Sequence, residues 1–136
     1  QAFAPVLAAN GGGALVNVLS VVSFVSSPHL STYSASKSAQ WSITNALRIA
    51  LRGQGTLVSG VHVGYIDTDL ASAIEAEKHT PELVAETILA GVAAGDEEIL
   101  VDEFSRDVKG GLSNDHDLLY PGIQAQYDAA QASITR

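Results

Sequence analysis

The chain has 136 residues, of which 46% are hydrophobic and 16% are charged, and it carries a formal net charge of -8 at pH 7. This length supports one buried core, in one domain or part of one, and the acidic balance excludes a basic surface for nucleic acid or for an anionic membrane. The absence of cysteine excludes disulfides and thiolate metal sites, and no apolar run approaches the ~20 residues of a spanning helix, so we expect a cytoplasmic protein without a membrane partner.

The first half of the chain predicts an alternation of helix and strand. Phe3, Val6 and Leu7 recur at helical spacing, and the apolar run that begins at Ala14 is typical of a parallel strand covered on both faces. A glycine cluster between them favours a flexible connection. The predicted elements are a helix end over Ala2–Ala9, a strand over Ala14–Leu19, a serine-rich loop over Val21–Thr32 and a helix over Tyr33–Leu51.

The second half continues the alternation, which favours a parallel α/β sheet. Thr80 as N-cap and Pro81 at the first helical position mark a helix start, and Gly95 marks its end. Acidic residues bracket the last strand and place it at a sheet margin. The predicted elements are a strand over Thr56–Val63, a short helix over Leu70–Ala76 capped by Asp67–Asp69, a helix from Thr80 to Gly95, a strand over Glu98–Asp102 and a weak helix over Phe104–Leu112.

The helix over Tyr33–Leu51 has two distinguishable faces. Small and aliphatic side chains at helical spacing predict the inner face, which consists of Ala39, Ile43, Ala46, Leu47 and Ala50. A second face carries Trp41, Asn45, Arg48 and Arg52. Since an exposed tryptophan is unusual in a monomer, we expect this second face to pack on a partner subunit.

The residues from about 113 to 136 are predicted to form an extended or helical tail. Ser113–Asp117 is a polar break, and Leu118–Pro121 supplies an apolar anchor before the Ala- and Gln-rich end. His116 lies between two aspartates, but adjacent residues of a solvated loop seldom converge on one ion. We therefore predict no metal site.

Ser20, Tyr33 and Lys37 have the residue types and spacing of a proton-transfer site. Tyr33 and Lys37 are four positions apart, so both side chains lie on one face of a helix. An unperturbed phenol is such a weak acid that it stays protonated at neutral pH, where it cannot accept a proton. A neighbouring ammonium favours the ionised form, which can act as a base. Ser20 ends the preceding strand, so Tyr33 can exchange a proton with a substrate oxygen that Ser20 holds.

The stretch Asn17–Lys37 resembles the active-site segment of the classical short-chain dehydrogenases/reductases, in which a serine ends a strand and Tyr-x-x-x-Lys begins the next helix. Leu19 departs from the family's Asn-x-Ser-Ser run, at the serine that is not catalytic. The resemblance implies that Ser20 polarises the substrate oxygen and that Tyr33 is the general acid or base. It also implies that Lys37 activates Tyr33 and holds the cofactor ribose.

A second segment, His62–Thr68, resembles the family's Pro-Gly-x-Ile/Val-x-Thr turn, which holds the nicotinamide end of the cofactor. Val63 replaces the usual proline, whereas Gly64 keeps the backbone open to close approach. By resemblance, the Ile66 backbone meets the carboxamide and the Thr68 hydroxyl bonds to the cofactor. The implied cofactor is NAD or NADP, and the implied cofactor-binding residues are Tyr33, Lys37, Gly64, Ile66 and Thr68.

The Gly-rich turn and the acidic or basic selector of a Rossmann-type dinucleotide site do not occur in this sequence. Gly11–Gly13 precedes a strand instead of opening a helix. By resemblance, residues 1–136 are the C-terminal portion of a single Rossmann-like domain, a doubly wound parallel sheet whose N-terminal cofactor-phosphate half is missing. The resemblance also implies a homo-oligomer, dimer or tetramer, assembled through the Tyr33–Leu51 helix.

The implied function is an oxidoreductase that transfers a hydride between NAD(P)(H) and a small carbonyl or secondary alcohol substrate. The alternative is a truncated, inactive fragment that serves only as a folding or assembly module, because the phosphate-binding half is missing. A Ser/His/acid hydrolase built from Ser20, His62 and Asp67 is disfavoured, since Ser20 lacks the flanking glycines of a nucleophile elbow.

Overall fold

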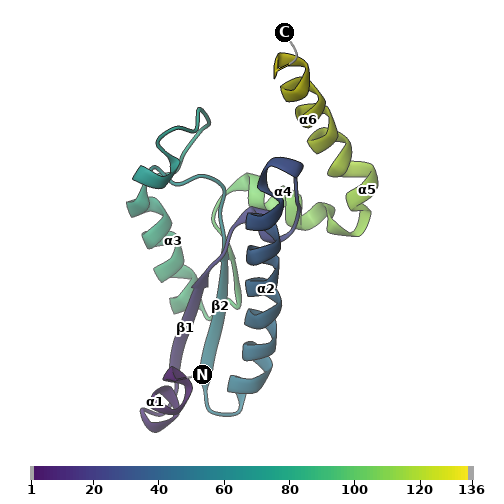
Figure 1. Ribbon diagram of the computed structural model, residues 1–136. Coiled ribbons are helices and arrows are strands. Elements are labelled where there is room, and N and C mark those ends of the chain that lie inside the picture. Colours follow the sequence, from purple (N-terminus) through teal and green to yellow (C-terminus); the bar gives the residue numbers. More distant parts are fainter. Residues whose placement is uncertain (1, 135–136) are drawn as a thin grey trace.

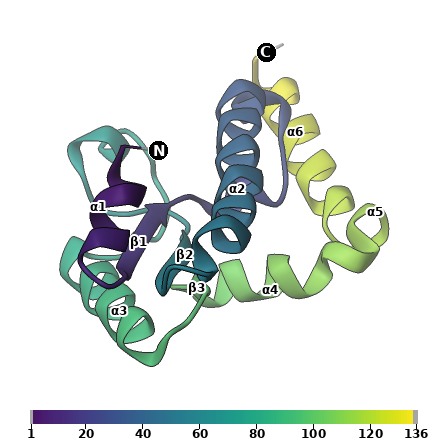
Figure 2. The same cartoon turned by 90° about the horizontal axis from the view of Figure 1, so that it is seen from below.

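The computed structural model describes residues 2–134, which form a parallel sheet with helices along both faces (Figure 1). The strands of this part are β1 (Gly13–Val18), β2 (Thr56–His62) and β3 (Glu98–Leu100). The helices are α1 (Phe3–Ala9), α2 (Ser31–Arg52), α3 (Pro81–Ala94), α4 (Glu103–Gly111), α5 (Asp115–Leu118) and α6 (Tyr120–Ile134). Figures 1 and 2 show α2 on one face of the sheet and α3 on the other.

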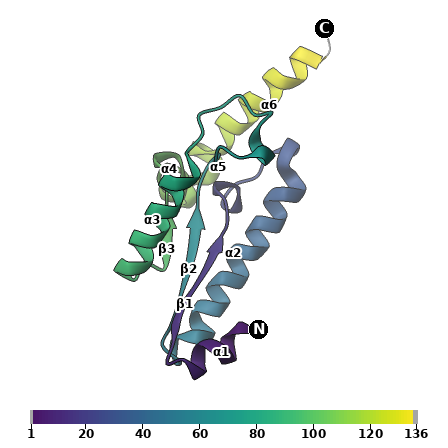
Figure 3. The same ribbon diagram turned by 90° about the vertical axis from the view of Figure 1, so that its left-hand side faces the viewer.

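The strand order is β1-β2-β3, and both pairings are parallel. The register starts with Gly13 opposite Thr56 in the first pair and with Gly60 opposite Glu98 in the second. The predicted α/β class and the marginal position of the last strand are therefore confirmed. Because parallel strands end at the same edge, the segments that follow β1 and β2 meet there, as Figure 3 shows.

β1 is less covered than its apolar sequence predicts. Val58 and Val61 of β2 are 1% and 0% exposed, whereas Val18 of β1 is 49% exposed. The difference follows from position, since β2 is central while β1 has a strand on one side only within the described residues. The prediction of a strand here is correct, but the expected cover on both faces is not found.

The predicted inner stripe of α2 is wrong. Ile43 is 58% exposed, whereas Ser34 and Thr44 are buried at 1% and 0%. Trp41 belongs to the inner face, where its ring packs edge-on against Phe24 with the ring centroids 4.8 Å apart. The face expected to bind a partner subunit is therefore the one that packs inside this chain.

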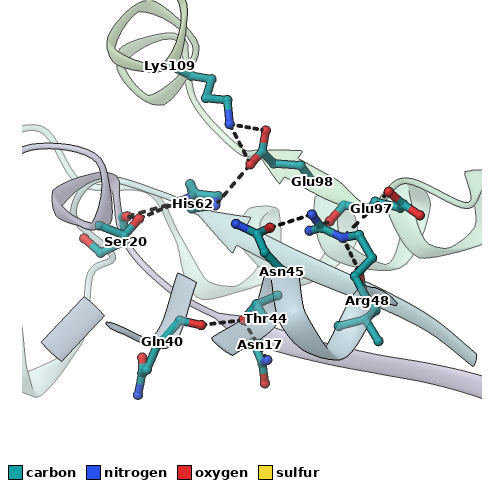
Figure 4. A network of polar contacts seen from close by, with 12 residues as sticks. Asn17, Ser20, Gln40, Thr44, Asn45, Arg48, His62, Glu97, Glu98 and Lys109 are labelled. Carbon is teal, nitrogen blue, oxygen red and sulfur yellow. Dashed lines mark hydrogen bonds and ion pairs between the residues drawn. The ribbon is translucent and has the colours of Figure 1, made fainter. Parts of the chain in front are cut away.

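Polar anchors set the orientation of α2 (Figure 4). Asn17 Nδ2 donates to Thr44 Oγ1 over 2.9 Å, which ties the helix to β1. Arg48 Nε donates to the Val58 carbonyl oxygen over 3.2 Å, which ties the helix to β2. Within α2, Arg48 Nη1 donates to Asn45 Oδ1 over 2.7 Å and holds the arginine side chain in place. A helix rich in alanine gains little from burying its small side chains, so these bonds outweigh its hydrophobic pattern.

Two glycines allow the N-terminal turn to pack on the turn after α2. Gly55 has φ of 73° and Gly12 has φ of 109°, both in the left-handed region that favours glycine. A side chain at Gly12 would overlap the carbonyl group of Gly55. The connection before β1 is therefore a specific turn as well as a glycine-rich one.

α3 begins and ends as the sequence predicts. Thr80 Oγ1 accepts a hydrogen bond of 3.2 Å from the Leu83 amide, and Pro81 occupies the first turn. Gly95, with φ of 82°, terminates the helix in the left-handed conformation.

The predicted short helix over Leu70–Ala76 is wrong. Only a 3-10 turn over Asp69–Ala71 forms, and the Thr68 side chain makes no capping hydrogen bond. Leu70 is 94% exposed, so the segment has no apolar contact at this position to offset the cost of ordering so short a helix.

The C-terminal helices cover one end of the core. A buried cluster of Val21, Val25 and Val108 is joined by the half-buried side chains of Val22, Phe24, Leu119 and Ile123. α4 ends at Gly111, just before the predicted polar break over Ser113–Asp117. The residues of the break are themselves ordered, in a 3-10 turn over Leu112–Asn114 and in α5. Of the predicted apolar anchor, Leu119 packs inward and Leu118 is 64% exposed. None of the helices in residues 2–134 is both long and apolar enough to cross a bilayer.

Candidate active site

Ser20 lies just after β1, beside the end of β2. Its side chain is 8% exposed, and its Oγ accepts a hydrogen bond of 3.4 Å from the Val22 amide. Oγ also lies 3.5 Å from the Val63 carbonyl oxygen, a long contact to which it donates. The Val21 amide donates to the same carbonyl over 3.0 Å, so the two strand ends are joined next to Ser20.

Ser23 and His62 brace the backbone at Ser20. Ser23 Oγ donates to the Ser20 carbonyl oxygen over 2.5 Å and lies 2.8 Å from His62 Nδ1. Since a hydroxyl has one proton, which Ser23 gives to Ser20, His62 Nδ1 carries the hydrogen and donates to Ser23. His62 Nδ1 also lies 3.3 Å from the Ser20 carbonyl oxygen, which is consistent with this tautomer.

The His62 ring is completely buried, stacked on Phe24 with the ring centroids 4.0 Å apart. Figure 4 shows it between Ser20 and Glu98, and its Nε2 lies 3.8 Å from Glu98 Oε1. Lys109 forms an ion pair of 2.8 Å with the same carboxylate. Burial lowers the pKa of His62 to about 4, and the bond to Ser20 and the charge of Glu98 only partly oppose this. The ring is therefore neutral at pH 7.

Tyr33 and Lys37 lie on one face of the first turns of α2. The Lys37 ammonium donates a hydrogen bond of 3.1 Å to the Val18 carbonyl oxygen, and it lies 5.7 Å from the centroid of the Tyr33 ring. Tyr33 is 45% exposed, so its phenol is accessible at the carboxyl edge of the sheet. Lys37 thus connects the helix to the strand that ends before Ser20.

The turn after β2 is held by bonds from outside the predicted motif. The Gly64 amide donates to Asp102 Oδ2 over 2.7 Å. Ile66 forms a parallel bridge with His79, and the Thr68 hydroxyl donates to the Ile66 carbonyl oxygen over a long 3.4 Å. The Thr68 side chain is exposed, so its hydroxyl is available to a ligand.

The predicted site residues lie at the carboxyl edge of the sheet, and two hydrogen bonds connect the elements that carry them. Ser20 is joined to the 64–68 turn through Val63, and Lys37 is joined to β1 through Val18. No hydrogen bond connects Ser20 directly with Tyr33 among the described residues. The hydroxyl and the phenol are therefore related through the strand and the helix that carry them.

The geometry does not support the hydrolase alternative. His62 Nδ1 contacts the backbone carbonyl of Ser20 and the hydroxyl of Ser23, not the Ser20 hydroxyl that would act as nucleophile. Asp67 is exposed, and its backbone amide donates a hydrogen bond of 2.9 Å to the His79 carbonyl oxygen. The described residues also contain no cluster of three or more His, Cys, Asp or Glu side chains that could hold a metal ion.

Three residues of this region, Ser23, His79 and Asp102, were not predicted to belong to the site. Asp102 is the N-cap of α4, and its side chain accepts a hydrogen bond from the Ser105 amide. Aspartate is a preferred N-cap residue, so the sequence alone could have indicated this role. Its contacts with Gly64 and His79, and the contact of Ser23 with His62, join segments far apart in the sequence. No local pattern indicates them.

Known proteins share both the sequence pattern and the fold. The family model described as short chain dehydrogenase matches residues 1–79. Cyclohexanol dehydrogenase of Acinetobacter sp. (strain SE19) is 34% identical over 71 residues, which are 52% of this chain and 28% of that enzyme. A protein of Mycobacterium tuberculosis (strain CDC 1551 / Oshkosh) named "Putative oxidoreductase SadH" is 32% identical over 120 residues, covering 74% of this chain and 44% of that protein. The chain thus spans less than half the length of these relatives.

Two solved structures extend the likeness beyond residue 79. A short chain dehydrogenase from Burkholderia cenocepacia J2315, in complex with NADP, superposes with a TM-score of 0.84 and 30% identity over 90% of this chain and 53% of that one. A short-chain dehydrogenase from Sphingobium yanoikuyae, in complex with NADPH, gives a TM-score of 0.67 over 98% of this chain and 49% of that one, and at 20% identity it shows the fold alone. With a Rossmann-like parallel sheet and a family match over more than half its length, the chain belongs to the short chain dehydrogenase family.

Proposed function

We propose that this chain carries the acid–base site of an NAD(P)-dependent oxidoreductase, with Ser20, Tyr33 and Lys37 as its catalytic residues. The observation that carries the proposal is the bond between the Lys37 ammonium and the Val18 carbonyl oxygen. This bond holds an ammonium between the phenol of Tyr33 and the strand that leads to Ser20. A phenol, a hydroxyl and an ammonium at one accessible sheet edge form a proton-transfer set for a carbonyl-sized group.

The residues present fit a nicotinamide cofactor. Lys37 uses one of its three N–H donors on Val18, which leaves two for ribose hydroxyl groups. The exposed Thr68 hydroxyl is only weakly engaged at 3.4 Å, and Gly64 presents backbone without a side chain. We therefore propose that Tyr33, Lys37, Gly64, Ile66 and Thr68 hold NAD or NADP. When bound, such a cofactor supplies or accepts the hydride.

The chain's own residues then handle the proton. In reduction, Tyr33 gives its phenolic proton to the substrate oxygen, and in oxidation it takes the proton back. Ser20 donates a hydrogen bond to that oxygen, at small cost, because its contact with the Val63 carbonyl is already 3.5 Å long. Lys37 places a positive charge 5.7 Å from the centroid of the Tyr33 ring, on the helix face that carries the phenol.

We propose a small secondary alcohol or carbonyl compound as the substrate. The name of the Acinetobacter relative, a cyclohexanol dehydrogenase, supports this class. We also propose assembly into a homo-oligomer through α2, but through its exposed side and not through the face of Trp41. That side carries Ile43 and Ile49, which are 58% and 80% exposed. The expected cytoplasmic location remains a prediction.

A module that assembles but binds no dinucleotide is the second candidate, and the open edge of β1 favours it. A groove of about 280 Å³ lies between β1 and α2. Its lining consists of Val16, Asn17, Val18, Gln40, Ile43 and Leu47. Within residues 2–134 this edge of β1 has no neighbouring strand, and an uncovered parallel strand favours association with another segment or chain.

Cofactor titration separates the two candidates. NADPH and NADH are titrated into the full chain while the nicotinamide fluorescence is followed, and saturable binding is expected for the oxidoreductase. Absence of binding at millimolar cofactor would favour the assembly module.

The catalytic assignment is tested by Tyr33→Phe, with Tyr127→Phe as the matched control. Tyr33→Phe should lower turnover of a cyclic secondary alcohol by at least ~10² with little change in cofactor affinity. Tyr127 lies on α6 against His29, so its loss of a hydroxyl should leave turnover unchanged. Near-normal turnover of Tyr33→Phe would defeat the assignment.

A further inference from the structure

Asp102 has more partners than a helix cap requires. It is 7% exposed and lies between β3 and α4, where its Oδ1 accepts a hydrogen bond of 2.7 Å from the Ser105 amide. This bond alone makes Asp102 the N-cap of α4, a role that serine or asparagine fills equally well. Burying a full charge there is unfavourable unless the second oxygen is also paired.

The second oxygen of Asp102 binds two other segments. Oδ2 accepts a hydrogen bond of 2.7 Å from the Gly64 amide and lies 3.2 Å from His79 Nε2. A side chain at Gly64 would place its Cβ 3.2 Å from the same oxygen, so the glycine permits this close approach. One carboxylate therefore joins the start of α4, the turn after β2 and the residue before the N-cap of α3.

His79 closes the base of the irregular segment 67–78. Its amide donates to the Tyr65 carbonyl oxygen over 2.9 Å, and its carbonyl oxygen accepts from the Asp67 amide over 2.9 Å. The two ends of the segment are thus paired with each other. The imidazole then attaches this pair to Asp102.

We propose that Asp102 is a positioning residue that fixes the 64–68 turn and the base of segment 67–78 for cofactor binding. The inference rests on the proposed function, which assigns Gly64, Ile66 and Thr68 to the cofactor. Without the carboxylate, the Gly64 amide loses its acceptor and His79 loses its anchor. The turn then samples other conformations, and those that meet the cofactor become a smaller fraction of the population.

Asp102→Asn separates the positioning role from the cap. The asparagine oxygen still accepts from the Ser105 amide, but its NH₂ group cannot accept from Gly64. We expect hydrogen exchange of the Gly64 amide to accelerate at least tenfold, and the dissociation constant of NADPH to rise about tenfold. Exchange in the first turn of α4 should stay as in the wild type. Glu103→Gln removes an exposed carboxylate from the adjacent position and should change neither quantity.

His79→Ala supplies a second, independent readout. It should leave the bond between Gly64 and Asp102 in place but release the base of segment 67–78, so trypsin should cleave after Lys78 several-fold faster. Conservative replacement by His79→Gln, whose amide can still donate to Asp102, should restore resistance. Unchanged cleavage in His79→Ala would contradict the anchoring role.

The outcomes distinguish the positioning role from the proposed function. Faster Gly64 exchange and weaker NADPH binding in Asp102→Asn support the inference. Unchanged exchange, or faster exchange with unchanged NADPH affinity, overturns it. If the wild type itself binds no NADPH, the proposed function fails and so does the cofactor part of this inference, whereas the exchange and cleavage measurements still decide whether Asp102 holds the turn.

Discussion

The Lys37 ammonium and the Val18 carbonyl oxygen are joined by a hydrogen bond of 3.1 Å between the start of α2 and the end of β1. Val18 precedes Ser20 by two positions, and Tyr33 precedes Lys37 by one helical turn. The bond therefore fixes the strand that carries the hydroxyl relative to the helix that carries the phenol.

Lys37→Met should reduce turnover by about 10² and weaken NADPH binding, because both the charge beside Tyr33 and the ribose donor are lost. The fold should survive, since an exposed hydrogen bond of this kind contributes only ~1 kcal/mol. Steady-state kinetics and thermal unfolding measure the two effects. Lys78→Met, in segment 67–78, is the control that should retain turnover. A parallel loss of stability and activity would point to a structural role for Lys37.

Ser23→Ala should lower the free energy of unfolding by about 1–3 kcal/mol, because it leaves the buried Ser20 carbonyl and His62 Nδ1 without this partner. Urea unfolding followed by tryptophan fluorescence reports the change, since Trp41 lies on the Phe24 side of the same core. Ser26→Ala, at an exposed position of the same loop, should be neutral. Equal stability of both variants would show that the brace at Ser20 contributes nothing.

His62 should make stability depend on pH between about 6.5 and about 4. Its pKa in the folded chain is about 4, below the ordinary value of 6.5, because burial disfavours the charged ring. The unfolded chain therefore binds the proton first as pH falls. The free energy of unfolding is fully supported above pH 6.5 and declines by up to about 3 kcal/mol as the pH falls to about 4.

His62→Gln is the comparison for this pH effect. It should be less stable at pH 7 but should lack the decline between pH 6.5 and 4. Burial raises the pKa of Asp102, but the hydrogen bonds from Ser105 and Gly64 and the nearby His79 together outweigh it and lower this pKa below its ordinary value of 3.8. The stability that Asp102 contributes is therefore lost only as the pH falls below 3.8, outside the range of His62. Identical pH profiles for wild type and His62→Gln would exclude the imidazole as their source.

Gly91→Ala and Gly110→Ala should have opposite effects on stability. A Cβ at Gly91 in α3 would lie 2.7 Å from Ile99 Cγ1 and Cδ1, so overpacking against β3 should cost ~1–3 kcal/mol. At Gly110 in α4 no atom lies within 4 Å of the added Cβ, so alanine should stabilise by up to ~1 kcal/mol. Thermal unfolding of both variants tests the packing of α3 on the sheet. A stable Gly91→Ala would mean that this contact is loose.

The candidate site was visible in the sequence because its residues are close together along the chain or follow a strand end. Tyr33 and Lys37 face the same way in any α-helix, and Ser20 and Gly64 each follow an apolar run that forms a parallel strand. Local spacing and the common direction of parallel strands therefore predicted the edge at which these residues lie. The N-cap Thr80 and the C-cap Gly95 of α3 could be predicted for the same reason, because a helix cap depends on the residue type at the end of the helix.

The side on which α2 packs was decided by tertiary contacts. The alanine-rich stripe predicted the wrong face, because bonds from Asn17 and Arg48 and the edge-on packing of Trp41 against Phe24 turn another face inward. Such contacts join residues far apart in sequence, so no periodicity reveals them. The helix predicted within segment 67–78 does not form for a related reason. Its residues have no apolar surface to pack against, so no burial offsets the entropy cost of ordering a short helix.

What the sequence determined by itself is the order of elements and the set of reactive groups, since both depend on local spacing and residue type. What only the tertiary structure decided is how those groups are held. His62 contacts the Ser20 carbonyl from 42 positions further along the chain, and the carboxylate of Asp102 binds the Gly64 amide from 38 positions further along. Their energies depend on burial and on distances that exist only once the sheet has formed, because a hydrogen bond or a charge pair acquires its strength from the exclusion of water.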